Sequence, residues 1–319
     1  MKISVLGCGR WGSFIAWYLS NQKHDVLMWG RKNSPSYKKL LDNGFNEYVK
    51  LNENIFLCDD LEKAINHAEV IIVSISSQSL RNFMADVVKC DIKDKIFCLC
   101  MKGIEENTGK RLSEIMIDCG VDASKVAVWV GPGHIQSFTL GYPSCMVIDS
   151  SNKELVKYLA DSFRSSLIRF YYGDDLIGNE IGAAAKNVIG IAAGMLDGGG
   201  YTTLKGPLMA RGAREVSRLI KALGGNELSA YGLCHLGDYE TTLFSEYSHN
   251  RKFGISFVKK EEFSKLAEGV STSKALKFLA EKYNVDLPIN NAVYSIINEG
   301  KDPMEALLYL FSRDIKKEF

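Results

Sequence analysis

The sequence has little of what marks secreted, zinc-dependent or nucleic-acid-binding proteins. Its 319 residues include six prolines, five histidines and eight cysteines, and no C-x-x-C pair occurs among them. Scattered cysteines without paired histidine spacing argue against a zinc site. They are typical of reduced core residues in a cytoplasmic protein. We therefore expect a cytoplasmic protein that holds no metal.

An excess of charge of either sign is also missing. The 39 basic and 38 acidic residues give a net charge of +1, so no electrostatic footprint for nucleic acid or a membrane surface is expected. No apolar run reaches the ~18–20 residues of a membrane helix. The apolar run at the N-terminus is too short for a signal peptide. These absences favour a partner that is a small molecule, with no nucleic acid and no membrane insertion.

The first half of the chain alternates short apolar runs with helical patterns. Such alternation predicts a mostly parallel sheet covered by helices on both faces. The expected strands are Lys2–Leu6, His24–Trp29, Val70–Ile75, Lys95–Cys100, Val126–Val130, Ser144–Ile148 and Ile168–Tyr172.

The second half is dominated by helical patterns with no strand-like alternation. The expected helices are Gly178–Leu196, Leu204–Leu223, Ser229–Thr241, Glu261–Glu268, Ser273–Tyr283, Pro288–Asn298 and Pro303–Lys317. The fold predicted for the chain is an α/β, doubly wound Rossmann domain over residues 1–176, followed by an all-α domain over residues 177–319. The second domain is expected to bind substrate and carry the catalytic group.

A glycine-rich turn follows the first expected strand. Gly7, Gly9 and Gly12 have the G-x-G-x-x-G spacing of a dinucleotide-binding turn, and a helical pattern begins within it. The first glycine allows the tight turn, the second lets the backbone approach a pyrophosphate, and the third lets helix and strand pack closely. The helix N-terminus then offers N–H groups to the phosphates.

The end of the second expected strand bears on the choice between NAD and NADP. An acidic residue at this place would favour NAD, but the sequence reads Trp29-Gly30-Arg31-Lys32. Two cations could pair with a 2′-phosphate, so the pattern leans to NADP. The alternative is that Arg31 and Lys32 are solvated loop charges.

The stretch from Ile181 to Gly200, IGAAAKNVIGIAAGMLDGGG, places one lysine among small apolar residues. Lys186 either lies along apolar surface with its ammonium in water, or points its charge at a ligand. The neighbouring Asn187 either orients a ligand or bonds to the backbone. Residue types alone leave both alternatives open.

An ordered set of motifs resembles the soluble, bacterial-type NAD(P)-dependent glycerol-3-phosphate dehydrogenase family along nearly the whole chain. The motifs are the Gly7–Gly12 turn, Trp29-Gly30-Arg31, Lys102–Glu105, Gly131-Pro132, Ala183–Gly198, Arg211-Gly212, Ala222–Gly225, Leu236–Asp238, Asn250–Gly254 and Ala267–Thr272. The resemblance implies reversible reduction of dihydroxyacetone phosphate to sn-glycerol 3-phosphate, which supplies glycerophospholipid synthesis. It also implies NAD or NADP as cofactor, and a homodimer as a possible assembly.

The resemblance also implies roles for particular residues. Lys186 matches the catalytic lysine, which acts as a general acid and base. The substrate-binding set is Lys102, Gly131, Gly133, Lys186, Asp238, Ser248, His249, Asn250 and Arg251. The cofactor-binding set is Gly7, Gly9, Arg10, Trp11, Gly12, Arg31, Lys32, Lys102, Ile135, His249, Leu266 and Glu268. The alternatives are a surface ion pair for Lys102 and a helix cap for Asp238.

Several positions depart from the family pattern. Gly133 lacks the usual hydroxyl, His249 replaces an arginine, and Arg10 replaces a small residue. Cys234-His235 replaces a small pair, and Thr202-Thr203 replaces Asp-Asn. Two further functions therefore stay open. One is a dehydrogenase of another small phosphorylated or carboxylated hydroxy compound, and the other is a catalytically weak, cofactor-binding regulatory protein.

Overall fold

The computed structural model describes every residue except 316 and 319 and divides the chain into two compact units. Unit 1 comprises Met1–Lys102 and Lys110–Glu180. Unit 2 comprises Gly103–Gly109 and Ile181–Phe319. The chain therefore enters unit 2 for a short segment before it returns to finish unit 1.

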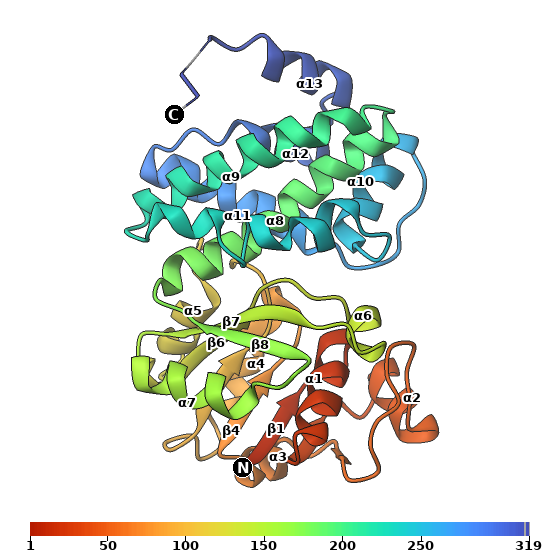
Figure 1. The fold of residues 1–319 in the computed structure, drawn as a ribbon, viewed down its shortest axis with the longest axis vertical. Coiled ribbons are helices and arrows are strands. Elements are labelled where there is room, and N and C mark those ends of the chain that lie inside the picture. The colour runs from red at the N-terminus through yellow and green to blue at the C-terminus, as the bar shows by residue number, and fades with distance from the viewer. Residues whose placement is uncertain (316, 319) are drawn as a thin grey trace. The chain divides into compact units, whose positions relative to one another are not determined.

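Unit 1 is built on one eight-stranded sheet (Figure 1). Its strands are β1 (Lys2–Leu6), β2 (Asp25–Trp29), β3 (Phe56–Cys58), β4 (Val70–Val73), β5 (Ile96–Leu99), β6 (Val126–Val130), β7 (Ser144–Ser150) and β8 (Ile168–Tyr172). The strand order is β3-β2-β1-β4-β5-β6-β7-β8, and only the β6–β7 pairing is antiparallel. The order reverses direction between β1 and β4, and the carboxyl ends of strands at such a point form the usual ligand crevice.

Helices cover both faces of this sheet. They are α1 (Arg10–Asn21), α2 (Pro35–Asn43), α3 (Leu61–His67), α4 (Leu80–Val87), α5 (Leu112–Asp118), α6 (Ile135–Thr139) and α7 (Lys153–Phe163). The first, second, sixth and seventh share one apolar core with the sheet. On the opposite face the Ser4 hydroxyl donates to the Ala64 carbonyl of α3 at 2.6 Å. Strands buried on both faces read as continuous apolar runs, which is why the sequence revealed them.

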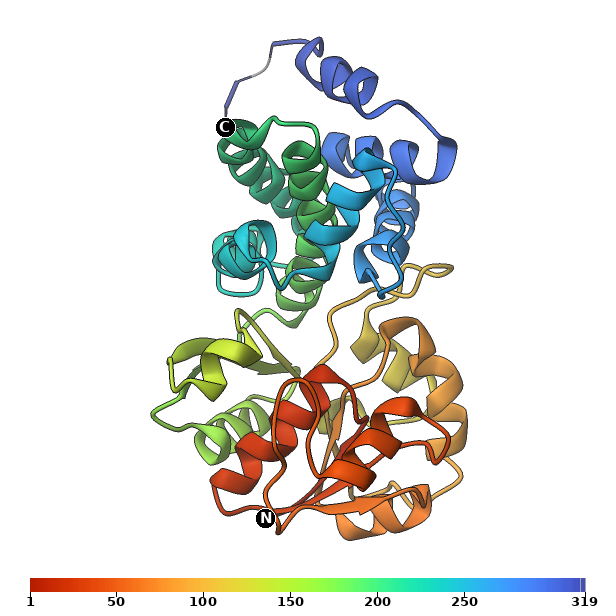
Figure 2. The same ribbon diagram turned by 90° about the vertical axis from the view of Figure 1, so that its right-hand side faces the viewer.

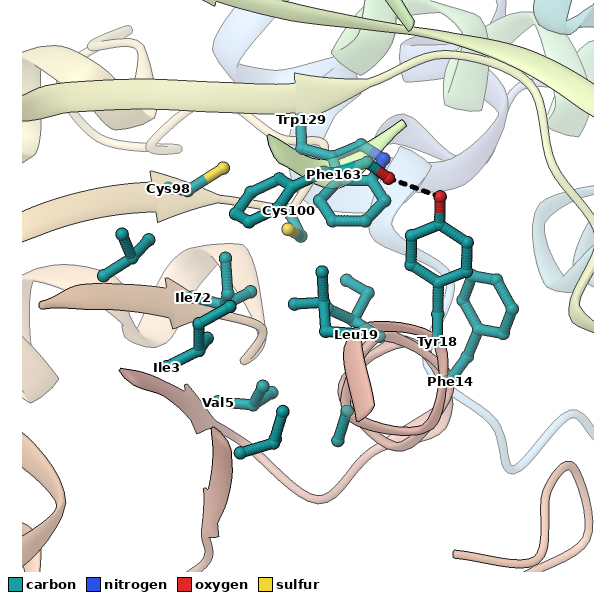
Figure 3. Close-up of a cluster of buried hydrophobic side chains, with 14 of the residues drawn as sticks. Ile3, Val5, Phe14, Tyr18, Leu19, Ile72, Cys98, Cys100, Trp129 and Phe163 are labelled. Atoms are coloured by element: carbon teal, nitrogen blue, oxygen red, sulfur yellow. Dashed lines mark hydrogen bonds between the residues drawn. The ribbon is translucent and has the colours of Figure 1, made fainter. Parts of the chain in front are cut away.

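Aromatic side chains fill the core of unit 1 beside α1 (Figure 3). The Phe14 ring stacks on Phe138, with 4.9 Å between centroids, and Trp129 stacks on Phe163. The Tyr18 hydroxyl donates to the Phe163 carbonyl at 2.5 Å, so this buried polar atom is paired. The packing fixes α1, and with it the turn that precedes α1.

Unit 2 contains helices and no strand among its described residues (Figure 2). The long helices are α8 (Leu176–Gly198, which starts in unit 1), α9 (Lys205–Ala222), α10 (His249–Lys259), α11 (Glu268–Tyr283), α12 (Pro288–Glu299) and α13 (Pro303–Phe311). The segment Gly103–Gly109 packs on α11: Glu106 pairs with Lys274 at 2.8 Å. None of the helices described is long and apolar enough to cross a bilayer.

Glycines let α8 and α10 approach backbone to backbone. A Cβ on Gly194 would lie 2.0 Å from the Arg251 carbonyl oxygen, and one on Gly254 would lie 2.2 Å from the Ile191 carbonyl oxygen. Such distances exclude any side chain without a shift of the helices. The small residues around Lys186 therefore serve helix packing.

The fold class predicted from the sequence is confirmed, and the seven expected strands are present to within two residues at each end. The three-residue edge strand β3 was missed. Two helix predictions are wrong. Residues 229–241 form short 3₁₀ turns and the start of a π-helical turn, Glu227–Tyr231, Leu236–Asp238 and Glu240–Phe244, because Gly232 and Gly237 interrupt the pattern.

The second wrong prediction is the helix over 261–268. The chain forms α10 earlier, and Lys260 ends it in a left-handed conformation with φ 58°. The Glu261 N–H then bonds back to the Ser256 carbonyl, which closes the helix end. The last helix stops at Phe311, short of the predicted Lys317; position 316 of that prediction lies outside the described residues.

Candidate active site

The glycine turn of unit 1 joins β1 to α1 as the sequence predicts. Gly7 has φ +127°, and its Cβ would lie 2.1 Å from the Ser74 carbonyl oxygen at the end of β4. A Cβ on Gly12 would lie 1.9 Å from the Gly7 carbonyl oxygen. At Gly9, by contrast, a Cβ would meet no atom within 4 Å. Packing thus requires glycine at positions 7 and 12. Gly9 faces open space at the N-terminus of α1, as the approach of a dinucleotide pyrophosphate requires.

Arg10 and Trp11, the first residues of α1, border this turn. The Arg10 guanidinium donates to the Gln136 side chain at 3.2 Å and lies 5.4 Å from the centre of the Tyr48 ring. Burial lowers the pKa of Arg10 below its usual value. A cation held at the start of α1 adds positive charge where phosphates would bind.

Lys102 follows β5 and reaches the same edge of the sheet. Its ammonium donates to the Gly131 carbonyl at 2.6 Å and lies 5.8 Å from the Trp11 ring centre. Gly131 follows β6 with φ +124°. The structure therefore brings three predicted site residues together at the carboxyl ends of β5 and β6.

The missing hydroxyl at Gly133 has a steric reason. A Cβ there would lie 2.6 Å from the Phe138 ring and 3.0 Å from the Trp11 ring. The two aromatic rings occupy the space that a serine would need. Ile135 starts α6 and is 1% exposed, with its side chain in the core of unit 1.

The end of β2 presents two cations to solvent. Arg31 and Lys32 are exposed, whereas a Cβ on Gly30 would lie 2.6 Å from both the Cys8 sulfur and the Tyr37 ring. Packing therefore excludes an acidic side chain at position 30.

In unit 2, the Lys186 ammonium is buried and paired. Its Nζ lies 2.5 Å from Asp238 Oδ2 and donates to the Thr242 hydroxyl at 3.0 Å. Lys186 is 7% exposed and Asp238 is fully buried. The carboxylate also accepts from the Thr241 hydroxyl. Lys186 thus directs its charge at a fixed carboxylate, and Asp238 serves as its ion-pair partner.

Thr242 is a site residue that the sequence did not reveal. It lies on the π-helical turn Glu240–Phe244, and its hydroxyl donates to the Asp238 carbonyl at 2.7 Å. The hydroxyl can therefore accept from Lys186 while it is held by the backbone. π-Helical turns are rare and gather at functional sites, but two adjacent threonines gave no sign of which one faces Lys186.

Asn187 and Asn250 form a second polar chain. Asn250 Nδ2 donates to Asn187 Oδ1 at 3.0 Å, and Asn250 Oδ1 accepts from the Gly269 N–H at 2.9 Å. Gly269 follows Glu268 in the first turn of α11. Asn250 therefore connects α8 and α10 to the start of α11, beside one residue predicted to contact the cofactor. Leu266 is 60% exposed in the preceding loop.

Ser248, His249 and Arg251 have different surroundings. Ser248 caps α10 by accepting from the Arg251 N–H, and His249 lies edge-on to Phe263. Arg251 Nε donates to Asp197 at 2.7 Å, and Lys205 pairs with the same carboxylate. Burial raises the pKa of Asp197, but the hydrogen bonds from Lys205 and Arg251 outweigh it and leave the pKa below its ordinary value.

No group of three or more histidine, cysteine, aspartate or glutamate side chains within the described residues has the arrangement of a metal site. All eight cysteines are free thiols.

Comparison with known proteins shows the family of the chain. Residues 2–156 match the family described as NAD-dependent glycerol-3-phosphate dehydrogenase N-terminus, and residues 175–308 match its C-terminus. The chain belongs to the NAD-dependent glycerol-3-phosphate dehydrogenase family. Membership implies an oxidoreductase that uses NAD or NADP.

Two relatives and one solved structure illustrate the similarity. Glycerol-3-phosphate dehydrogenase [NAD(P)+] from Chlorobium phaeobacteroides is 35% identical over 100% of this chain and 99% of its own. The enzyme of that name from Macrococcus caseolyticus is 34% identical, with all of both chains covered. The crystal structure of glycerol-3-phosphate dehydrogenase from Coxiella burnetii superposes with a TM-score of 0.88, at 25% identity and 98% coverage of both chains. The glycerol-3-phosphate dehydrogenase fold thus extends along the whole chain.

Proposed function

We propose that this protein reversibly reduces dihydroxyacetone phosphate to sn-glycerol 3-phosphate with NADPH or NADH, and that Lys186 is its general acid and base. The observation that carries the proposal is the buried Lys186 ammonium held by Asp238 and Thr242. It occurs in a chain 35% identical, end to end, to a protein named for this reaction.

The chemistry fits these groups. The bound reduced nicotinamide supplies the hydride that reaches the ketone carbon. The carbonyl oxygen then needs a proton, and the Lys186 ammonium donates it while stabilising the developing negative charge. In the reverse direction the neutral amine takes the proton from the substrate hydroxyl. Asp238 and Thr242 fix the ammonium, so little reorganisation is needed in the transition state.

The residues of unit 1 suit the cofactor. The open face of Gly9 and the N-terminus of α1 would take the pyrophosphate, with Arg10 adding charge. Lys102 would bind both substrate and cofactor from its place beside Trp11. Gly131 and Gly133 would contribute backbone groups to the binding of the substrate.

Residues of unit 2 would complete the binding of substrate and cofactor. We assign the substrate phosphate to Ser248, His249, Asn250 and Arg251, since hydroxyl, amide and cationic groups bind phosphate well. Glu268 and Leu266 would contact the cofactor. With histidine in place of arginine at position 249, phosphate binding should weaken as the pH rises past the range where imidazole is protonated.

The reaction is tested by following oxidation of NADPH and of NADH with dihydroxyacetone phosphate. We expect turnover with both cofactors and stereospecific formation of sn-glycerol 3-phosphate. No turnover of this ketone despite NADPH binding would contradict the proposal. A panel of phosphorylated and carboxylated ketones would then test the drift in substrate that Gly133 and His249 allow. Binding without turnover of any of them would indicate a regulatory protein.

Cofactor preference is tested by removing both cations after β2. We expect Arg31→Ala with Lys32→Ala to weaken NADPH binding by at least about tenfold, because charge-assisted hydrogen bonds contribute about 1.5–3 kcal/mol each. NADH affinity should stay within about twofold, since NADH has no 2′-phosphate to pair. Fluorescence titration measures both, with the exposed Lys38→Ala as control. Equal losses for the two cofactors would refute a role in 2′-phosphate recognition.

We further propose a cytoplasmic homodimer that serves glycerophospholipid synthesis, with a dinucleotide-binding domain over 1–176 and a substrate domain over 177–319. Eight free thiols support a reducing compartment. Leu308 and Phe311 of α13 are 60% and 64% exposed and would be covered by a second copy.

A further inference from the structure

A buried histidine lies three residues before Asp238. His235 is fully buried, and its ring is surrounded by polar groups of unit 2. Nδ1 lies 2.9 Å from the Gly182 carbonyl of α8, and Nε2 lies 2.7 Å from the Tyr239 hydroxyl. From the sequence, the only feature of this residue was its departure from the small pair of the family pattern.

The Gly182 carbonyl determines which nitrogen of the neutral His235 ring carries the hydrogen. A carbonyl oxygen only accepts, so Nδ1 carries the hydrogen and Nε2 accepts from the Tyr239 hydroxyl. Burial lowers the pKa of His235 to about 4, although the carbonyls of Gly182 and Gly212 partly offset this. Burial also raises the pKa of Tyr239 well above its ordinary value. Both groups are therefore neutral at pH 7, and neither exchanges protons with substrate.

Gly182 precedes Lys186 by four residues, which is about one turn of α8, or ~6 Å along its axis. The segment from His235 to Asp238 spans this turn. At one end the His235 ring is anchored on Gly182, and at the other the Asp238 carboxylate holds the Lys186 ammonium. The Asp238 N–H also donates to the His235 carbonyl at 3.0 Å. These contacts connect one turn of α8 to the 3₁₀ turn at both of its ends.

The His235 and Tyr239 side chains are closely packed against two glycines. A Cβ on Gly182 would lie 3.0 Å from His235 Cβ, and a Cβ on Gly212 would lie 3.0 Å from the Tyr239 hydroxyl. Gly182 on α8 therefore leaves space for the His235 side chain, and Gly212 on α9 leaves space for the Tyr239 hydroxyl. A larger residue at position 182 would press on the His235 side chain, and one at position 212 would press on the Tyr239 hydroxyl.

We propose that His235 is a positioning residue: its hydrogen bond to Gly182 sets the place of Asp238 against the Lys186 ammonium. The proposal rests on the catalytic role of Lys186 proposed above. His235 touches neither the ammonium nor the substrate, and it acts only through Asp238. Of the charged groups in unit 2, Lys186 and Asp238 act on the histidine, and Glu215 acts on Tyr239.

The test compares two replacements of His235. Asparagine can keep the hydrogen-bond donor near the position of Nδ1, whereas leucine keeps much of the volume and removes the donor. Lys186 is probed directly by competitive labelling with an amine-acylating reagent over a pH series, read by mass spectrometry. This readout needs no turnover, so it works whether or not the proposed reaction is correct.

We expect His235→Leu to move the Lys186 labelling curve to lower pH, because an ammonium that loses its carboxylate partner gives up its proton more readily. The alkaline limb of kcat for ketone reduction should move the same way. A misplacement of about 1 Å can cost about 100-fold in rate, so kcat should fall by about 10–100-fold with little change in KM. His235→Asn should restore the labelling curve and most of kcat.

Two controls separate positioning from loss of stability. Asn290→Ala removes a buried hydrogen bond to the Ser273 carbonyl elsewhere in unit 2, and it should lower the melting temperature without moving the labelling curve. Tyr239→Phe leaves the Gly182 anchor and should also leave the curve in place. An unchanged curve in His235→Leu would overturn the proposal. If the labelling curve moves in His235→Leu and the wild-type protein turns over no ketone, the proposed reaction is refuted and the positioning role stands.

Discussion

Replacement of Lys186 with alanine is expected to lower kcat for dihydroxyacetone phosphate reduction by about 10²–10⁴-fold, the usual contribution of a general acid. NADPH affinity should change little, because the cofactor-binding residues of unit 1 are untouched. Steady-state kinetics with an NADPH titration measures both quantities.

Stability must be controlled in this experiment. Lys186→Ala removes the ion-pair partner of the fully buried Asp238 carboxylate, and breaking a buried ion pair costs about 3–5 kcal/mol. The double variant Lys186→Ala with Asp238→Asn removes that charge and should fold more stably while remaining inactive.

Lys205 provides a matched control, since it is also a buried lysine paired with a buried aspartate, Asp197. Lys205→Met should destabilise unit 2 yet keep kcat within about tenfold of wild type, well short of the loss expected for a general acid. If Lys186→Ala and Lys205→Met lose activity equally, Lys186 has no special chemical role.

Gly9→Ala is expected to abolish tight cofactor binding while leaving the fold intact. Gly9 has φ −76°, which alanine adopts readily, and no atom lies within 4 Å of its Cβ position. The melting temperature without ligand should therefore change by only about a few degrees. The added methyl would occupy the space in which a pyrophosphate approaches the backbone, so NADPH affinity should fall by at least about tenfold, or ~1.4 kcal/mol.

Two other glycines calibrate that result. Gly12→Ala would place a Cβ 1.9 Å from the Gly7 carbonyl oxygen and should lose stability and cofactor binding together. Gly206, near the start of α9, also has open space around its Cβ position. Gly206→Ala should change neither cofactor binding nor the fold. Undiminished NADPH binding by Gly9→Ala would mean that the turn holds no pyrophosphate.

The sequence predicted best what short stretches of chain determine. The strand, glycine turn and helix at the N-terminus were recognisable because Gly7 and Gly12 meet close backbone contacts from neighbouring elements. Lys186 was singled out by its apolar setting and by family resemblance. Each of these signals lies within one short stretch of the chain, so a linear pattern carries it.

What the sequence did not reveal depends on segments distant along the chain. Thr242 contacts Lys186 across 56 positions, through a π-helical turn that no periodicity announces. His235 bonds to Gly182 across 53 positions. The helix α10 begins after the N-cap Ser248 and ends at the left-handed Lys260. It was missed because the helical pattern was assigned to residues 261–268 instead. Tertiary contacts decided the places of Thr242 and His235, whereas the ends of α10 are set by local capping.

The excursion of Gly103–Gly109 into unit 2 determines how the protein can be divided. The chain crosses from one unit to the other after Lys102, after Gly109 and after Glu180. A fragment that stops at 180 would keep this segment but lose Lys274, the partner of Glu106, and Leu279, which packs against Gly109. A single cut after Glu180 therefore leaves unit 1 with an extra segment that has lost its packing, and leaves unit 2 without that segment. A cofactor-binding module made from this chain needs the segment replaced by a linker, and a helical module needs it supplied as a separate peptide.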